Sequence, residues 1–384
     1  MTTFVQIHTL RDYGPSLPNR GADGLAKRCH YGDAERQRIS SQCIKAALRE
    51  PTLGLAELAA ELGLDMSVRS GAAISRVLGP DLESRGMSEE DAKAYAKGVA
   101  SAFVKEGGPV EDDGKLSQPI VVGGTELRLL ADIAEALQSK EIGADEVRNV
   151  LAKPSSARKA GVEDIIASMH ATNANAGIDG ALFGRFATGV ALHTVDGCVD
   201  VAHALTTHQI QSVANFFSAQ DQLLEEDEAG AAHIGTVELT TALYYNYAVV
   251  NVDQLSKNIA SLDVNQRAQL IAWIVRAFAT VEPAAKRGST APYSELIDLV
   301  VEVGKRQPVS YVGAFRQAIR PCAGEDIADL SKTKLTDHMT RLDGIYGGPG
   351  QRFCLANYEG RPDRPALTMI DDDVITALAG SEAE

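Results

Sequence analysis

The stretch RQRISSQCIKAALR, residues 36–49, places a serine pair between a basic segment and a short apolar repeat. Ser40 or Ser41 is a suitable N-cap, and Pro51 shows that a helix starting there has ended before that residue. The i, i+3, i+4 spacing of a helical face is met by three apolar residues, Ile44, Ala47 and Leu48. The stretch therefore predicts a short amphipathic helix.

The same helix would carry polar and basic side chains beside its apolar face. Ser41, Lys45 and Arg49 fall at i, i+4 and i+8. Arg36 and Arg38 precede the first turn, whose backbone N–H groups lack partners within the helix. An anion is favoured there, so a phosphate backbone is one candidate ligand. The alternative is a solvated basic face in which Arg49 only complements the helix C-terminus.

The basic stretch is notable because the chain of 384 residues is acidic, with a formal net charge of −15 and a pI near 5.0. From Lys27 to Arg49, six basic residues stand against Asp33 and Glu35, a local balance of +4. Such an acidic composition argues against a protein covered by nucleic acid on every face. It leaves room for one basic groove.

The overall composition, 45% hydrophobic and 23% charged, predicts a folded protein of two or three lobes. No stretch approaches the roughly 20 apolar residues of a membrane span, and residues 1–10 lack the pattern of a leader peptide. We therefore expect a cytoplasmic protein. The five cysteines include no C-x-x-C pair, which predicts free thiols and argues against a structural zinc site.

The pattern along the chain predicts an α+β fold with insertions. Residues 4–10, FVQIHTL, alternate like a half-buried strand, and residues 11–33 form a Gly- and Pro-rich loop. Helical sequence dominates residues 52–175. Later segments are predicted as strands at 179–192, 198–210, 235–252 and 294–303, and as helices at 253–281 and 326–346.

An acidic segment at residues 211–234 has the character of a projecting lobe. It contains the adjacent aromatic residues Phe216 and Phe217 in polar surroundings. Such a pair could stack on bases or wedge between them. The alternative is that one ring packs inward and the other closes a subunit contact.

Enzymatic chemistry has little support in the sequence. The glycine and hydroxyl pattern of a phosphate-binding loop is absent. Four histidines in the middle third could serve a metal-dependent RNA-processing enzyme: His193, His203, His208 and His233. Their spacing matches no known set of metal ligands, so structural or surface roles are expected.

Five short motifs in register resemble one family of proteins. They are PSLPNR at 15–20, RISSQ at 38–42, ALFGRFAT at 181–188, AHALTTHQI at 202–210 and AHIGTVEL at 232–239. Together they resemble the repeated backbone subunit of the type I-E CRISPR surveillance complex Cascade, the CasC or Cas-seven family. The resemblance is weakest in the helical insertion and in the last sixty residues.

The resemblance implies an RRM-like (ferredoxin-like) palm with a helical fingers insertion and a protruding thumb. The corresponding parts are the start of the palm at 1–50, fingers at 51–177, palm strands at 178–210, the thumb at 211–234, and the rest of the palm with an acidic tail at 235–384. It also implies a non-catalytic protein of antiviral defence that binds CRISPR RNA without cofactor or metal. Expected partners are further copies of the chain, other Cascade subunits and, through guide pairing, target DNA.

The family's RNA-binding positions map onto residues of this sequence. Together with the basic stretch, they give the candidate RNA-binding set Arg20, Lys27, Arg38, Ser40, Gln42, Lys45, Arg49, Arg185, Phe186, Phe216 and Phe217. Phe216 stands where a familiar member has Trp, and Phe186 where it has Met. Ala46 replaces a basic residue that is common in relatives. Two alternatives remain, the metal-dependent enzyme and an oligomer that assembles without RNA.

Overall fold

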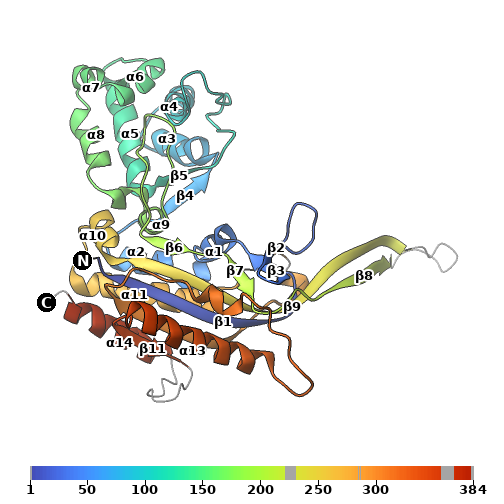
Figure 1. Ribbon diagram of the computed structural model, residues 1–384. Helices are drawn as coiled ribbons and strands as arrows, with labels where there is room; N and C mark the ends of the chain where they lie inside the picture. Colours follow the sequence, from blue (N-terminus) through green and yellow to red (C-terminus); the bar gives the residue numbers. More distant parts are fainter. Residues whose placement is uncertain (1, 221–230, 284, 286, 356–366, 382–384) are drawn as a thin grey trace. The chain divides into compact units, whose positions relative to one another are not determined.

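The computed structural model describes residues 2–220, 231–283, 285, 287–355 and 367–381, which form two compact units (Figure 1). The first, called the sheet unit, comprises Met1–Leu53, Asp200–Val250 and Ala268–Glu384. The second, called the helical unit, comprises Gly54–Val199 and Asn251–Arg267. Each unit is therefore assembled from segments that are far apart in the sequence.

The sheet unit is built on a nine-stranded sheet in which seven strands follow the order β11-β10-β1-β9-β7-β3-β2. The two others, β6 and β8, each pair with β9. The strands are β1 (Phe4–Ser16), β2 (Arg28–Tyr31), β3 (Ala34–Ile39), β6 (Val199–Val201), β7 (Ala204–Thr206), β8 (Ser212–Gln220), β9 (Ala231–Asn251), β10 (Glu295–Gly304) and β11 (Gln351–Cys354). β1 pairs antiparallel with β10, from Phe4 opposite Gly304 to Asp12 opposite Glu295.

The helices of the sheet unit are α1 (Ser41–Ala47), most of α11 (Val264–Thr280), α12 (Arg287–Thr290), α13 (Ile327–Tyr346) and α14 (Leu367–Ser381), with short 3₁₀ segments at Pro51–Leu53 and Tyr311–Phe315. α13 contacts β1, and α14 contacts β10 and β11. One core cluster joins Leu335 and Met339 of α13 to Leu10 and Val300 of the sheet. From Ala268 to Ala279, α11 is buried except at Gln269 and Arg276, the pattern of a helix that packs most of its surface in a core.

The helical unit contains α2 (Leu55–Glu61), α3 (Gly79–Ser84), α4 (Glu89–Ser101), α5 (Gly124–Ser139), α6 (Val147–Ala152), α7 (Pro154–Ala160), α8 (Glu163–His170), α9 (Ile178–Phe183) and α10 (Val252–Asn258). A separate two-stranded antiparallel sheet pairs β4 (Ser67–Ser70) with β5 (Ile120–Gly123). The core of the helical unit is formed by apolar residues of α3 to α8, including Leu82, Val99 and Leu130. In the described part of the chain, no helix has both the length and the apolar character needed to cross a membrane.

The predicted mixture of helices and strands is confirmed, and several elements differ from the prediction. Residues 179–192 were expected as a strand, but they form α9 and an irregular segment in the helical unit. The helix expected over 253–281 is interrupted between α10 and α11. The side chains of Asp263 and Gln266 each accept the other's backbone N–H, at 2.8 and 3.0 Å. This capping box starts a new helix.

Strand β1 is also longer and more buried than the alternation of residues 4–10 predicts. Every residue from Val5 to Arg11 is buried, so both faces of the strand are covered. Burial of the polar residues Gln6, His8 and Arg11 is tolerated because each of these side chains makes hydrogen bonds inside the protein. Gln6 Nε2 donates to Glu302 Oε2 at 3.1 Å, and Gln6 Oε1 accepts from Tyr247 Oη at 2.8 Å.

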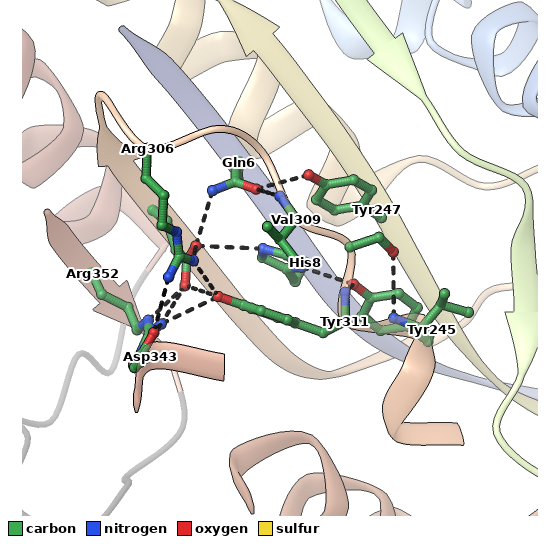
Figure 2. Close-up of polar contacts among 12 residues, drawn as sticks. Gln6, His8, Tyr245, Tyr247, Arg306, Val309, Tyr311, Asp343 and Arg352 are labelled. Atoms are coloured by element: carbon green, nitrogen blue, oxygen red, sulfur yellow. Dashed lines mark hydrogen bonds and ion pairs between the residues drawn. The ribbon is translucent and has the colours of Figure 1, made fainter. Parts of the chain in front are cut away.

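A buried polar network surrounds His8 of β1 (Figure 2). The His8 ring stacks on Tyr247 and Tyr311, with ring centroids 4.8 and 4.3 Å away. Its Nδ1 lies 2.8 Å from the Tyr245 hydroxyl. Glu302 accepts hydrogen bonds from Arg352 Nε at 2.7 Å and from the Tyr311 hydroxyl at 2.7 Å. The network ties β1, β9 and β10 to the segment that leads into α13.

Candidate nucleic-acid interface

Helix α1 begins as predicted, with Ser40 as its N-cap. Ser40 Oγ accepts the Cys43 N–H at 3.4 Å, and the Ser40 N–H donates to Asn19 Oδ1 at 2.9 Å. Ser40 is only 4% exposed. The Ser40 hydroxyl therefore caps the helix from a buried position and does not lie on the surface that a ligand would contact.

Gln42 and Lys45 lie on α1, and Arg49 follows two residues after its last residue. Gln42 is exposed, and Lys45 and Arg49 are half-buried. The apolar face is buried as predicted, at Ile44, Ala47 and Leu48. Arg49 Nη1 donates to the Lys45 carbonyl at 3.0 Å, the contact that the helix-end alternative predicts. A guanidinium has five N–H donors, so this contact and a phosphate contact are compatible.

Residues 19–27 form a small hairpin beside this helix. The Lys27 N–H donates to the Asn19 carbonyl at 2.9 Å, and Arg20 and Ala26 form an antiparallel bridge. Arg20 is exposed and Lys27 is half-buried. The segment predicted as a long loop is therefore largely ordered by its own backbone hydrogen bonds.

Lys27 and Arg38 both affect the side chain of His203. Partial burial lowers the pKa of His203, and the charges of Arg38 and Lys27 lower it further. Arg38 Nη1 lies 3.0 Å from His203 Nδ1. Burial raises the pKa of the Cys43 thiol on α1, and the charge of Lys27 opposes this rise. Lys27 therefore lies close enough to α1 to add its charge to the helix.

These side chains define the basic surface of the sheet unit. Its members are Arg20, Lys27, Arg38, Gln42, Lys45 and Arg49. Cationic groups on a hairpin, a strand and a helix suit a phosphate chain that passes along all three.

Arg36 does not belong to the basic surface, and its placement on the basic edge is wrong. Its side chain is fully buried. Arg36 Nη1 donates to the carbonyls of Thr206 and Thr207 at 3.0 and 2.9 Å, and Nη2 donates to the Phe315 carbonyl at 2.8 Å. Buried carbonyl groups need donors. Arg36 therefore joins strands and loops inside the sheet unit.

The described part of the predicted lobe is a two-stranded ribbon of β8 and β9, whereas residues 221–230 lie outside the described part. Phe216 is opposite Thr236 and Phe217 is opposite Gly235. Phe216 is 64% exposed and Phe217 39%. A Cβ at Gly235 would lie 2.5 Å from Phe217 Cζ, so the Phe217 ring covers this glycine. Neighbouring residues of a strand face opposite sides, so the two rings lie on opposite faces of the ribbon.

Arg185 and Phe186 lie in the helical unit and have contrasting surroundings. Arg185 is 4% exposed, and its Nη1 donates to Glu126 Oε2 at 2.5 Å. Its Nε and Nη2 both donate to the His193 carbonyl. The assignment of Arg185 to an RNA surface does not fit this burial. Phe186 is 82% exposed and remains a candidate.

The four histidines do not form a cluster in the described residues. His193 lies in the helical unit with its Nε2 2.8 Å from Asn173 Oδ1, whereas His203 and His208 lie in the sheet unit. His208 Nδ1 contacts the Gln209 carbonyl, and its Nε2 accepts the Leu243 N–H. The side chain of His233 lies outside the described part. Among the described residues, no three His, Cys, Asp or Glu side chains are grouped to hold a metal ion.

The sequence analysis missed the residues that hold the hairpin in place. Asn19 entered the sequence analysis only as part of the PSLPNR motif, and no role was assigned to its side chain. The available signal was that asparagine after proline is a common hydrogen-bond acceptor in turns. Glu238 accepts the Ala26 N–H and Arg28 Nη2, both at 2.5 Å. No local pattern predicts this second contact, since 210 positions separate Arg28 from Glu238.

The sequence profile of a family described as CT1975-like protein matches residues 5–377. No curated protein sequence matches the chain.

Solved structures also resemble this chain. One is a chain of a "CRISPR RNA-guided surveillance complex, pre-nicking", with a TM-score of 0.77 and 26% identity, covering 97% of this chain and 100% of the other. Another belongs to a "CRISPR RNA-guided surveillance complex", with a TM-score of 0.58 and 21% identity, covering 97% and 99%. The second likeness concerns the fold alone.

Proposed function

The chain belongs to the CT1975-like protein family, and from this premise we propose that it is a backbone subunit of a CRISPR RNA-guided surveillance complex. The full-length likeness to a chain of such a complex supports this role. We further propose that the chain binds CRISPR RNA and assembles in several copies along it. The type I-E subtype, a cytoplasmic location and the absence of catalytic activity are parts of the same proposal.

The basic surface is the observation that carries the RNA-binding proposal. Lys27, Arg38 and Lys45 come from three different elements, and the surface belongs to an otherwise acidic chain. Phosphate contacts supply affinity without regard to base sequence. A guide of any sequence would therefore be held, while an acidic remainder discourages binding elsewhere.

The proposed mechanism of guide presentation follows from the parts of the RNA that these side chains would contact. If the protein holds the guide by its phosphates, the base edges stay available for pairing with target DNA. Exposed rings at Phe186, Phe216 and Phe217 would stack on or displace bases, because every base has a face suited to stacking. Specificity would then come from base pairing and not from side chains.

The family resemblance supplies the finer architecture of the proposal. The sheet unit would contain the RRM-like palm, the helical unit the fingers, and the β8–β9 ribbon the described part of the thumb. Copies of the chain, other Cascade subunits and target DNA would be the partners. Residues 212–217 of β8 are exposed on both faces of the strand, which suits a segment that becomes covered on assembly.

A salt series of RNA binding tests the proposal. We would measure fluorescence anisotropy of a labelled repeat–spacer RNA with the wild type and with the Lys45→Ala, Arg49→Ala double variant. Loss of two phosphate contacts should lower affinity and reduce the slope of log K against log salt by about 1.4, the value for single strands. The Lys332→Ala, Arg341→Ala variant removes the same charge from α13 and should bind as the wild type does.

Four results would contradict the proposal. Equal affinity and slope in the wild type and the α1 variant would remove these residues from the site. Equal losses in the α1 and α13 variants would show that only net charge matters. Assembly into regular oligomers without RNA would favour the protein-only alternative, and chelator-sensitive RNA cleavage would favour the enzyme.

A further inference from the structure

Glu238 holds the 19–27 hairpin against the β8–β9 ribbon. It lies on β9, and its side chain is 8% exposed. One carboxylate oxygen accepts the Ala26 N–H and the other accepts Arg28 Nη2, each at 2.5 Å. Buried charge-assisted hydrogen bonds are stronger than neutral ones. The hairpin and the ribbon are therefore joined by one carboxylate.

The register of the ribbon shows which face the hairpin meets. Glu238 is directly opposite Ala214, and Phe216 is opposite Thr236. Opposite residues of an antiparallel pair share a face, as do residues two apart on one strand. Glu238 and Phe216 therefore lie on one face, separated along the ribbon by about 7 Å. Phe217 lies on the other face.

A second contact supports this placement. Thr240, two residues beyond Glu238 on the same face, accepts a hydrogen bond from Gln37 Nε2 at 2.6 Å. The Thr240 hydroxyl also donates to the Ser16 carbonyl at 3.0 Å. The base of the ribbon is thus fixed to the strands on either side of the hairpin.

We propose that Glu238 is a positioning residue that sets the distance between the RNA-binding hairpin and the aromatic ribbon of the same chain. This inference rests on the proposed function. In an assembly along one RNA, the hairpin would hold one stretch of phosphates and the ribbon would reach another. A fixed distance between them would make the interval between displaced bases regular from copy to copy.

The sequence provides a matched control for this role. Arg28 also pairs with Glu35, at 3.5 Å, but Glu35 lies on β3 and is 47% exposed. Glu35→Gln removes a carboxylate from Arg28 without touching the ribbon, whereas Glu238→Gln removes the one that joins the two elements. The amide of Glu238→Gln still provides an acceptor for the Ala26 N–H, so the fold should be retained.

Hydrogen exchange in the full chain tests the tether itself. Amides of residues 19–28 should exchange roughly tenfold faster in Glu238→Gln, because a hydrogen bond to a charged group is lost. Arg28→Gln should show the same change, and the double variant should add little to either single variant. Exchange in Glu35→Gln should match the wild type. Equal exchange in Glu238→Gln and Glu35→Gln would overturn the tether.

Chemical probing of RNA in the assembled complex tests the positioning role. The wild type and Glu35→Gln should give evenly spaced reactive nucleotides, and Glu238→Gln should give uneven spacing. Faster hairpin exchange combined with even spacing would reduce Glu238 to a structural residue and overturn the inference. No RNA binding by the wild-type complex would instead overturn the proposed function, and with it the positioning role, while the exchange comparison would still decide the tether.

Discussion

Asn19 Oδ1 accepts the backbone N–H of Ser40 at 2.9 Å, across 21 positions of sequence. This bond joins the 19–27 hairpin to the residue that caps α1. The two basic elements of the candidate RNA surface therefore share one buried hydrogen bond. Asn19 is 9% exposed, so water does not readily replace it.

The Asn19→Ala variant should therefore lose both stability and RNA affinity. It leaves the buried Ser40 N–H without its acceptor, which costs about 1–3 kcal/mol in the free energy of unfolding. Urea denaturation measures the loss of stability, and RNA anisotropy measures the loss of affinity. Asn19→Asp keeps the acceptor and should recover most of the stability. Equal destabilisation by both variants would show that the bond to Ser40 is not what matters.

Arg36 and Lys45 should separate stability from binding. Arg36→Ala removes a buried side chain that donates to three carbonyl groups, so we expect a loss of about 3 kcal/mol or more. Lys45→Ala, at a half-buried surface position, should change stability by about 0.5 kcal/mol at most and act on RNA affinity. Denaturant unfolding of both variants measures the difference. Similar stability of the two would contradict the structural role given to Arg36.

Elements with a strong local pattern were predictable from the sequence. The strand at 294–303, the helix at 326–346 and the Ser40 cap are confirmed because periodicity and capping act over a few neighbouring residues. The break at Asp263 was missed although its capping box is also local. The apolar repeat on both sides of it masked the signal.

Long-range polar contacts could not be predicted in this way. Arg36 looked like part of a basic edge because its carbonyl partners at Thr206 and Thr207 are about 170 positions away. Arg185 was assigned to an RNA surface because of its motif, yet its guanidinium forms a buried ion pair with Glu126 inside the helical unit. Charge alone does not reveal whether an arginine serves a ligand or the fold. The burial of its guanidinium does.

Aromatic stacking by the ribbon leads to a prediction about base displacement. Phe217→Ala should leave the affinity of a single subunit for RNA nearly unchanged, because the ribbon would reach a different stretch of RNA from the one that the basic surface holds. It should disturb the regular pattern of displaced bases, since stacking contributes about 1–3 kcal/mol per base. Nucleotide reactivity along the assembled RNA measures the pattern. Val213→Ala is the matched control, because Val213 is 69% exposed and lies on the same ribbon face. A pattern equally regular in both variants would argue against base displacement by Phe217.

Acidification should destabilise the sheet unit through His8. Burial lowers the pKa of His8 well below its usual value, and the charges of Arg352 and Arg306 lower it further. Below about pH 6.5 the unfolded chain therefore binds a proton that the folded chain does not, so stability is present above that pH and falls as the pH decreases. The titration of His8 lowers the free energy of unfolding by up to roughly 1.4 kcal/mol for each pH unit below about pH 6.5.

Urea denaturation between pH 7.5 and pH 5 would reveal the effect of His8. The His8→Asn variant should show a shallower loss of stability with falling pH, even if its stability at neutral pH is lower, because one titrating group is gone. The comparison of slopes separates proton linkage from lost packing against Tyr247 and Tyr311. Identical slopes in the wild type and the variant would mean that His8 does not bind its proton differently in the folded and unfolded chain.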